Sequence, residues 1–401
     1  MTAPPRGAPT LPLEGIQVVA VEQAVAGPFA SRQLADLGAR VIKIERPGGG
    51  DLARRYDTTV RGLSSHFVWL NRSKESLTLD LKRPEAAAIL EKLLGASDVF
   101  LHNLAPGAID RMGFSAERLR ASYPGLIVGS VSGYGSPGPF SNRKAYDLLI
   151  QAESGLLSIT GTEDAPCKVS VPVADISAGM YLFSGVLAAL IQRGRTGIGS
   201  VVDVAMLDAL GEWMGYPAYY ARYGGTPPAR TGAHHATIAP YGPYPTGDGR
   251  VVLLAIQNER EWANLCEQVL SRPDMITDGR FATIPDRVKN RDALNAVIAD
   301  VFGTLTADEV VARLDEARVA NARMRSVQEF TEHPQLAARE RWTEIDSPVG
   351  ALRALHPPIQ IDGVPSAMGP VPGVGEHTRP ILEELGFLPD EIAALERDAI
   401  I

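Results

Sequence analysis

The chain has 401 residues, of which 45% are hydrophobic and 21% are charged, and its formal net charge at pH 7 is -8. This is ordinary globular composition, with enough length to bury two cores. Without a large positive field, neither nucleic acid nor an anionic membrane surface is expected as a partner. Cys167 and Cys266 lack the spacing of a disulfide framework or a metal site, so we expect no metal and a reducing, cytoplasmic location.

The start of the chain and its most apolar stretch argue against targeting and membrane insertion. Residues 1–12 contain four prolines and no apolar run, so we expect a flexible arm and no signal or transit peptide. The longest apolar stretch, 180–192, stops after about 13 residues, whereas a membrane helix needs roughly 18.

Strand and helix patterns alternate along the first part of the chain. Residues 16–23 and 39–47 are typical of strands and flank a helix expected over 26–38. The alternation continues with a strand at 76–82, a helix at 84–97, a strand at 98–104, a helix at 115–125 and a strand at 126–135. Such βαβ repetition predicts an α/β fold with a mostly parallel, Rossmann-like wound sheet.

The second half of the chain predicts a change of domain. A strand-like run at 168–174 precedes a long apolar helix from Asp175, and a strand follows at 200–207. Glycine and proline are frequent over 223–250, which excludes one continuous element there. We expect a large domain over 13–222, a smaller α+β domain with linkers over 223–335, and a return to the large domain over 336–401.

Asp175 has two interpretations from its position at the start of a helix. Its side chain can cap the helix by accepting a backbone hydrogen bond. An ionised carboxylate beside the positive end of the helix is also placed to act as a nucleophile. Residues 26–28, Ala-Gly-Pro, lack the further glycines of a dinucleotide fingerprint, and no phosphate-binding loop motif occurs, so NAD and ATP have little support.

Seven segments, taken in order, resemble the class III CoA-transferase family of the CaiB/BaiF type. That family includes formyl-CoA and carnitine CoA-transferases and α-methylacyl-CoA racemase. The segments are AGPFASRQLADLGARVIKIERPGGGDLAR (26–54), NRSKESLTLDLK (71–82), HNLAPGAIDRMGF (102–114), SGYGSPGP (132–139), YDLLIQAESGLLSITG (146–161), VADISAGMYLFSGVLAAL (173–190) and GEHT (375–378).

The resemblance implies roles for individual residues. Asp175 is the expected nucleophile, and Asp147 is an acidic group expected to assist it. The residues expected to bind the adenine and phosphates of CoA are Arg46, Leu79, Lys82, Asn103, Arg111 and Lys144. The resemblance further implies acyl-CoA, CoA and small carboxylic acids as substrates, no tightly bound cofactor, and an interlocked homodimer.

The chain departs from the family pattern at positions that affect substrate recognition. Val25 replaces the glutamine that precedes Ala-Gly-Pro in formyl-CoA transferase, and Tyr56 is the aromatic residue after the GDLAR turn, so both are expected at the acyl group. The family pattern Asn-Phe-Arg-Pro-Gly reads Asn-Leu-Ala-Pro-Gly over 103–107. One aromatic and one basic contact to CoA are therefore missing.

Two alternatives to a transferase stay open. In the racemase branch a histidine stands where this chain has Tyr146, and a tyrosine with a pKa of about 10 is a poor general base at pH 7. Racemisation is therefore the less favoured activity. A non-catalytic CoA-binding protein could share the fold, but retention of Asp175 argues against it.

The run at 211–244 is similar to family members that act on branched C4–C5 dicarboxyl-CoA esters, including mesaconyl-CoA C1–C4 transferase. Arg230, His234 and His235 would then pair with a second carboxylate, which is costly to bury alone. We expect a short dicarboxylic acid such as mesaconate, succinate or malate. The alternative, in which 230–244 is a linker, Arg230 faces solvent and the substrate is a monocarboxylic acid, stays open.

Overall fold

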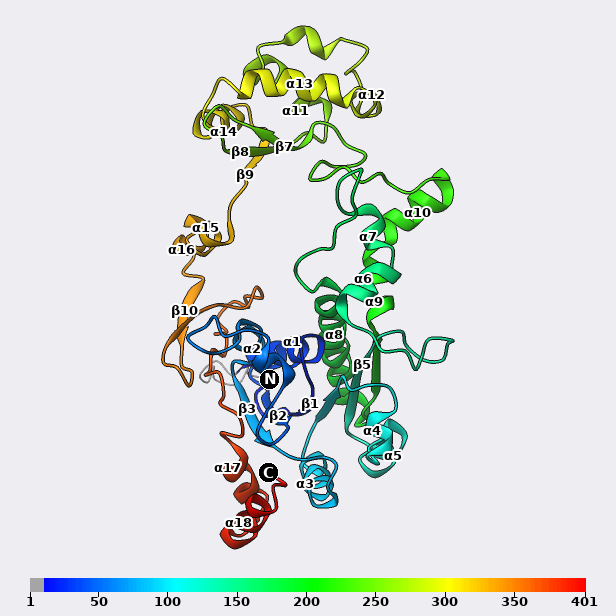
Figure 1. The fold of residues 1–401 in the computed structure, drawn as a ribbon, viewed down its shortest axis with the longest axis vertical. Coiled ribbons are helices and arrows are strands. Elements are labelled where there is room, and N and C mark those ends of the chain that lie inside the picture. The colour runs from blue at the N-terminus through cyan, green and yellow to red at the C-terminus, as the bar shows by residue number, and fades with distance from the viewer. Residues whose placement is uncertain (1–10) are drawn as a thin grey trace, which may run out of the picture. The chain divides into compact units, whose positions relative to one another are not determined.

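The structure is a computed structural model that describes residues 11–401 (Figure 1). The chain forms two compact units. Unit 1 takes the chain through Ser154, then Ser170–Trp213 and Leu336–Ile401, and unit 2 takes Gly155–Val169 and Met214–Gln335. The ranges expected from sequence differ from this division at Gly155–Val169 and near Met214. The expected arm lies almost entirely outside the described residues.

A six-stranded parallel sheet forms the centre of unit 1, in the order β3-β2-β1-β4-β5-β6. Its strands are β1 (Gln17–Val21), β2 (Arg40–Glu45), β3 (Lys74–Thr78), β4 (Val99–His102), β5 (Ile127–Ser132) and β6 (Val201–Ala205). The strand order reverses between β1 and β4, and ligands of wound sheets bind at the carboxyl ends beside such a point. The predicted Rossmann-like sheet is confirmed.

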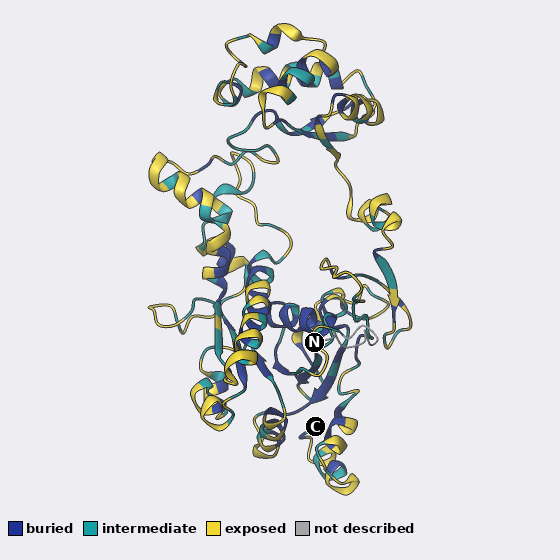
Figure 2. Cartoon of the chain, turned by 180° about the vertical axis from the view of Figure 1, so that it is seen from behind, coloured by how far each residue is buried: buried dark blue, intermediate teal, exposed yellow. Residues whose placement is uncertain are grey.

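Helices cover both faces of this sheet. On one face, α1 (Ala26–Asp36) packs against α8 (Val173–Thr196), and α8 also contacts β5 and β6. On the other face, the strands share an apolar core with α3, α5, α17 and α18. These are α3 (Pro84–Gly95), α5 (Ala116–Ser122), α17 (Thr378–Glu384) and α18 (Pro389–Arg397). Figure 2 shows the strands mostly buried and the covering helices exposed on their outer sides.

The shorter elements of unit 1 connect these layers. They are η1 (Leu52–Arg55), α2 (Ser65–Asn71), α4 (Ala108–Arg111), α6 (Asp147–Glu153), α9 (Met206–Trp213) and the antiparallel pair β10 (Trp342–Ile345) and β11 (Leu352–Leu355). The helix α16 (Pro334–Ala338) spans the boundary between the units.

Unit 2 is an α+β unit with the antiparallel sheet β7-β8-β9. Its elements are α7 (Leu156–Ile159), α10 (Gly215–Gly224), β7 (Tyr241–Pro245), β8 (Val251–Ala255), α11 (Glu259–Asn264), η2 (Leu265–Val269), η3 (Pro273–Ile276), α12 (Ile284–Lys289), α13 (Arg291–Phe302), α14 (Ala307–Glu316), β9 (Ala320–Arg323) and α15 (Val327–Thr331). The strand β7 lies inside the stretch 223–250, where the glycines and prolines predicted no single continuous element. It tolerates Pro243 and Pro245 because it is an edge strand.

The long helix α8 begins earlier than expected. It starts at Val173, so the strand-like run at 168–174 forms no strand, and Asp175 lies inside the first turn. By length and composition α8 is apolar enough to cross a membrane. It also packs on α1, β5, β6 and α9, and core helices of soluble proteins meet the same criterion, so this is weak evidence for a membrane span.

Candidate active site

Asp175 lies in the first turn of α8, and the side chain that caps this helix comes from another helix, α6. The first residue of α6, Asp147, accepts hydrogen bonds at Oδ1 from the backbone N–H groups of Ala174 (2.7 Å) and Asp175 (3.3 Å). Its Oδ2 accepts from Nε2 of Gln151 at 2.6 Å. Within residues 11–401, no group donates a hydrogen bond to the Asp175 carboxyl. The capping role belongs to Asp147, and the Asp175 carboxyl is available for chemistry.

The surroundings of Asp175 make it a stronger base than an ordinary aspartate. Burial, and after it the negative charge of Asp147, raise the pKa of the Asp175 carboxyl to about 7. Its ionised fraction therefore changes across neutral pH. Perturbed carboxyl groups of this kind gather at functional sites, and a carboxylate of higher pKa is the better nucleophile when ionised.

Tyr56 lies within electrostatic reach of this carboxyl, and Tyr146 lies within reach of Tyr56. Burial raises the pKa of Tyr56, and Asp51, Asp175 and Tyr146 raise it further. Tyr56 is half-exposed and packs edge-on against His66, with ring centroids 5.4 Å apart. Tyr146 immediately precedes α6 and is 71% exposed. Of the two tyrosines expected as substrate contacts, the structure brings Tyr56 to Asp175, and it places Tyr146 next to Asp147 and within reach of Tyr56.

The turn that leads into α1 is held by side chains from two other segments. The backbone N–H of Gln23 donates to Oδ1 of Asn103 at 2.9 Å, and Nδ2 of Asn103 donates to the carbonyl oxygen of Gln23 at 2.8 Å. The next N–H, of Ala24, donates to Oδ1 of Asp51 at 3.0 Å. Val25 follows, buried, at the N-cap of α1. Asn103, which is expected to contact CoA, and Val25, which is expected to contact the acyl group, thus meet at this turn.

Beneath this turn lies a buried network of charges. Nζ of Lys43 lies 2.8 Å from Oδ2 of Asp51 and 3.4 Å from Oε1 of Glu22, and Nζ of Lys74 lies 2.8 Å from the same Glu22 oxygen. Burial opposes the charge on Glu22, but Lys74 and Lys43 outweigh it and lower the pKa of Glu22. Burial lowers the pKa of Lys74 to about 8. The network pairs two carboxylates with two ammonium groups, and all four side chains are inaccessible to solvent.

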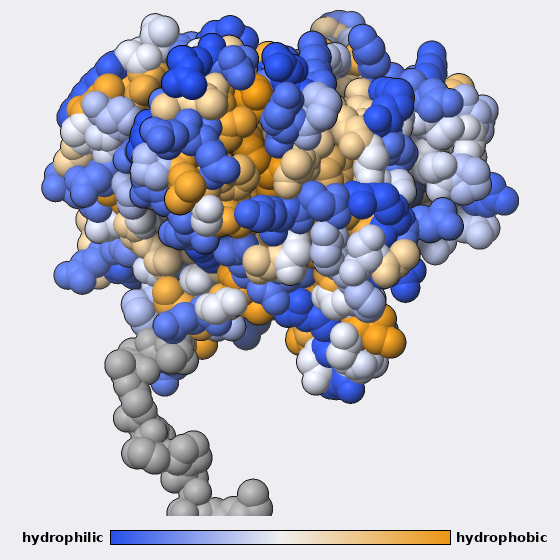
Figure 3. Space-filling view, turned by 90° about the horizontal axis from the view of Figure 1, so that it is seen from below, coloured by the Kyte–Doolittle hydropathy of each residue, from blue (hydrophilic) through white to orange (hydrophobic). Residues whose placement is uncertain are grey.

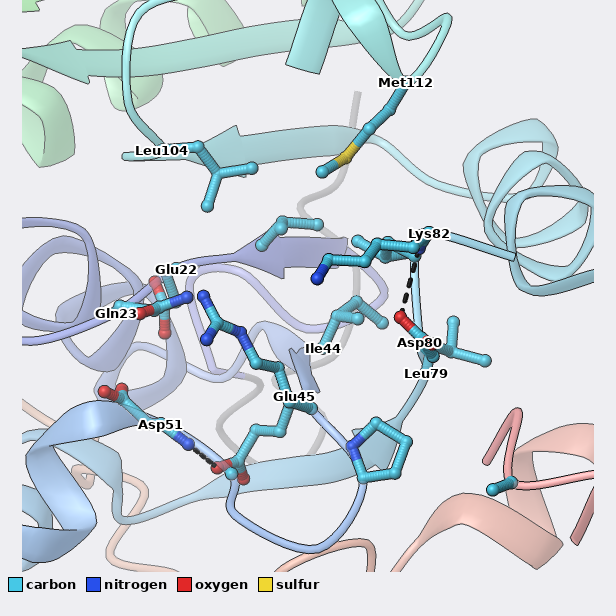
Figure 4. Close-up of a pocket in the computed structure, with 16 residues that line it drawn as sticks. Glu22, Gln23, Ile44, Glu45, Asp51, Leu79, Asp80, Lys82, Leu104 and Met112 are labelled. Carbon is cyan, nitrogen blue, oxygen red and sulfur yellow. Dashed lines mark hydrogen bonds between the residues drawn. The ribbon is translucent and has the colours of Figure 1, made fainter. Parts of the chain in front are cut away.

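A pocket of about 470 Å³ opens at the carboxyl ends of β1, β2 and β3. It is lined by Val21, Glu22, Gln23, Ile44, Glu45, Arg46, Pro47, Gly50, Asp51, Leu79, Asp80, Leu81, Lys82, Leu104, Met112 and Ala399. Figure 4 shows the ammonium group of Lys82 directed into this pocket, with Leu104 and Met112 across from Asp51 and Glu45. Its position beside the reversal of strand order is that of a ligand site.

The six residues expected to bind CoA fall into three groups. Arg46, Leu79 and Lys82 line the pocket, although the Leu79 side chain belongs to the apolar core and its N–H bonds the carbonyl of Glu45. Asn103 and Arg111 precede the lining residues Leu104 and Met112. Lys144 lines a separate depression of about 440 Å³ with Tyr134, Arg143, Leu149, Ala152 and Glu153.

The residues expected to bind a second carboxylate lie in unit 2. Arg230 donates to three carbonyl oxygens, those of Ser158 in α7 (3.2 Å) and of Thr162 (2.9 Å) and Glu163 (2.8 Å) in the turn that follows. The ring of His235 stacks on Tyr241 at 5.1 Å. These contacts explain why Gly155–Val169 belongs to unit 2, and they occupy the Arg230 guanidinium.

The histidine pair has a basic neighbour that the sequence did not single out. Burial, and then Arg291, lower the pKa of both His234 and His235. Nη2 of Arg291 donates to the carbonyl of His235 at 2.7 Å. Both histidines are therefore neutral at pH 7, which suits packing and hydrogen bonding more than pairing with an anion.

The sequence motifs do not single out the acidic residues around the pocket or the lysines that balance them. Glu22, Lys43, Asp51 and Lys74 carry the network; Glu22 directly follows the apolar run of β1, and Lys43 lies within that of β2. A charged residue such as Lys43, in the middle of the β-branched run of a central parallel strand, is a signal that could have identified them, because both faces of such a strand are covered. Among residues 11–401 no group of histidine, cysteine, aspartate or glutamate side chains is arranged to hold a metal.

Comparisons with known proteins agree on one family. The model of CoA-transferase family III matches residues 13–378. Succinyl-CoA:glutarate CoA-transferase of Mus musculus is 33% identical, over 93% of this chain and 86% of that protein. Formyl-CoA:oxalate CoA-transferase of Escherichia coli O157:H7 is also 33% identical, over 97% of this chain and 99% of that protein.

A solved structure gives the same result. The crystal structure of a CaiB/BaiF family protein from Brucella suis is 33% identical and superposes with a TM-score of 0.82, covering 94% of this chain and 100% of that one. Sequence and fold therefore agree along nearly the whole chain. This chain belongs to CoA-transferase family III.

Proposed function

We propose that this enzyme moves CoA between carboxylic acids through covalent intermediates on Asp175. One observation carries the proposal. The Asp175 carboxyl lies in the first turn of α8 without a hydrogen-bond partner among the described residues, its pKa is raised to about 7, and Asp147 supplies the helix cap in its place. A carboxylate that is partly buried, basic and free of a capping role suits nucleophilic attack.

The proposed reaction keeps the energy of the thioester in each intermediate. The Asp175 carboxylate attacks the acyl carbonyl of the donor, the C–S bond breaks, and an aspartyl-acyl anhydride forms with release of CoA thiolate. The thiolate attacks the aspartyl carbonyl, which gives an aspartyl-CoA thioester and releases the donor acid as a carboxylate. The acceptor carboxylate then reverses the two steps. Water must be excluded throughout, because it would hydrolyse either intermediate.

We propose a short dicarboxylic acid, of the mesaconate, succinate or malate kind, on at least one side of the exchange. Support comes from the two relatives described above, because the name of each includes a dicarboxylate, glutarate or oxalate. The segment 230–244 is the candidate for contact with the second carboxylate. Because three carbonyls already engage the Arg230 guanidinium, we expect this contact to come from the rest of the segment.

We also propose a cytoplasmic homodimer. Free cysteines at 167 and 266 suit a reducing compartment. Figure 3 shows hydrophobic patches between hydrophilic side chains on one face of the molecule, and large hydrophobic side chains such as Ile191, Tyr219 and Tyr223 are exposed. A second subunit could cover part of this surface. Light scattering that gives the mass of one chain at micromolar concentration would contradict the dimer.

The test is a matrix of acyl-CoA donors against carboxylic acid acceptors, followed by mass spectrometry. Succinyl-CoA and mesaconyl-CoA are compared with butyryl-CoA and a bulky aromatic acyl-CoA, with and without free acid, and C1 and C4 isomers are followed separately. We expect transfer with a dicarboxylic partner to be favoured. A preference for butyryl-CoA or the bulky ester of more than about tenfold in kcat/KM, or roughly 1.4 kcal/mol, would refute the dicarboxylate proposal.

The nucleophile is tested in the same assay. Asp175→Asn should lower the transfer rate by at least about a thousandfold while CoA still binds, because the nucleophile is lost and the pocket is not. Asp390→Asn changes an exposed aspartate in the first turn of α18 and should leave transfer unchanged. Hydroxylamine or borohydride should trap an adduct on Asp175 after acyl-CoA is added. An adduct on another residue would reassign the nucleophile.

A further inference from the structure

We infer that Asn103 is a positioning residue, which fixes the turn Gln23–Val25 between the pocket and the helix of Asp175, and that it is not a CoA ligand. The inference rests on the proposed function of Asp175. Its starting point is that the Asn103 amide is engaged on both sides by one residue. Oδ1 accepts from the N–H of Gln23 at 2.9 Å, and Nδ2 donates to the Gln23 carbonyl at 2.8 Å.

The turn needs such a restraint because its backbone is strained. Ala24 has a φ of 62°, in the left-handed region, which costs a residue with a Cβ atom about 1 kcal/mol. Strain of this kind persists only where the surroundings impose it. Asp51 holds the N–H of Ala24 at 3.0 Å, and Lys43 fixes Asp51 at 2.8 Å. Asn103 holds the preceding residue, Gln23, by both its N–H and its carbonyl group. Together with the N–H of Ala24, three consecutive backbone polar groups of the turn are therefore fixed.

The turn connects the pocket with the catalytic helix. Gln23 lines the pocket, whereas Val25 caps α1. The start of α1 packs closely on α8, since a Cβ atom at Gly179 would lie 2.7 Å from the carbonyl oxygen of Ala26. Gly179 is four residues after Asp175 and lies on the same side of the helix. A shift of the turn would therefore move the pocket wall relative to the Asp175 carboxyl.

The packing around the Asn103 side chain agrees with a fixed position. A Cβ atom at Gly27 would lie 3.2 Å from Cγ of Asn103 and 3.0 Å from Cβ of Glu22. The amide is thus enclosed between the turn and the start of α1. With its oxygen and one N–H group engaged by the backbone, Asn103 has one N–H group left for any other partner.

Two substitutions separate positioning from ligand binding. Asn103→Leu keeps the approximate size and removes both hydrogen bonds. We expect kcat to fall by about tenfold or more, while KM for acyl-CoA and the dissociation constant of CoA stay within about threefold of the wild type. Lys82→Ala, at a pocket residue, is the matched comparison, and it should weaken CoA binding with a smaller effect on kcat.

Asn103→Asp adds a readout that a ligand role would not produce. A carboxylate there accepts from the Gln23 N–H but repels the Gln23 carbonyl, whereas a protonated carboxyl can donate to that carbonyl and restores both bonds. The ratio of variant to wild-type kcat should therefore rise as the pH falls from 8 to about 5.5. Using the ratio removes the titration of Asp175, which both proteins share.

Calorimetry of CoA binding tests the role of Asn103 independently of the proposed function. An Asn103→Leu protein that melts like the wild type but binds CoA about tenfold more weakly or worse would overturn the inference, even if the wild type transferred no CoA. The inference would also be overturned if Asn103→Leu raised KM at constant kcat, or if the ratio of Asn103→Asp to wild-type kcat did not change with pH. If the wild type transfers CoA without any adduct on Asp175, the proposed mechanism fails but the binding result for Asn103 stands.

Discussion

The interiors of the two units differ in the kind of side chain they bury. Under the pocket of unit 1, Glu22, Lys43, Asp51 and Lys74 are all nearly inaccessible and paired with one another. The described core of unit 2 is a cluster of apolar side chains, and Arg287 is its buried charged residue. Buried ion pairs are seldom more stabilising than apolar groups of the same volume. We therefore interpret the charges of unit 1 as serving the site above them.

The largest effect on stability should come from breaking that network. Lys43→Met leaves Glu22 and Asp51 buried without one of their cations, so the free energy of unfolding should fall by about 3–5 kcal/mol. Arg272→Met, in the exposed pair with Asp274 in unit 2, should leave the free energy of unfolding nearly unchanged, because solvent screens this pair. Urea titrations followed by circular dichroism measure both. Equal losses would remove the contrast between the units.

A smaller effect should follow from the charge of Asp147. Asp147→Asn keeps an oxygen for the N–H of Ala174 and removes one of the two causes that raise the Asp175 pKa. The pKa should fall from about 7 toward its usual range, by roughly one unit. Since the ionised form of Asp175 is the nucleophile, activity rises with pH, and its rising limb should move to lower pH. A kcat/KM profile measured from pH 5 to 9 shows this, and a limb that stays or moves upward would contradict it.

A still smaller effect is expected in unit 2. Arg230→Met removes three exposed hydrogen bonds to carbonyls of 158–163, which should lower the stability of unit 2 by about 1 kcal/mol and make that segment more sensitive to protease. The preference for succinyl-CoA over butyryl-CoA should not change. A selective loss of succinyl-CoA activity would instead show that Arg230 pairs with the second carboxylate.

The smallest expected signal concerns racemisation. The family resemblance implies that Tyr146 stands where racemases have a histidine, and a phenol is a weaker general base near neutral pH than an imidazole. A 2-methylacyl-CoA incubated with the enzyme in deuterated water should therefore take up little deuterium and keep its optical purity. Rapid uptake, detected by mass spectrometry, would favour the racemase alternative over transfer.

The sequence by itself determined most of the strands and helices of unit 1. Alternation of β-branched runs with helical periodicity placed β1, α1, β2, α3, β4, α5 and β5 close to their observed bounds, since each pattern reflects a local period. The resemblance along nearly the whole chain identified the family and singled out Asp175. Local patterns failed at β7, where two prolines indicated turns, because the position of a strand at the edge of a sheet is not a local property.

Only the tertiary structure decided what each polar group near the site does. Asp147 caps α8 across 27 residues of sequence, and Asn103 reaches Gln23 across 80. The raised pKa of Asp175 likewise depends on burial and on a charge from another helix. Hydrogen-bond partners and desolvation depend on which distant segments meet in space, so no sequence period encodes them. The sequence, through its family resemblance, singled out Asp175 and Asp147, and the fold determined which backbone groups and charges surround each of them.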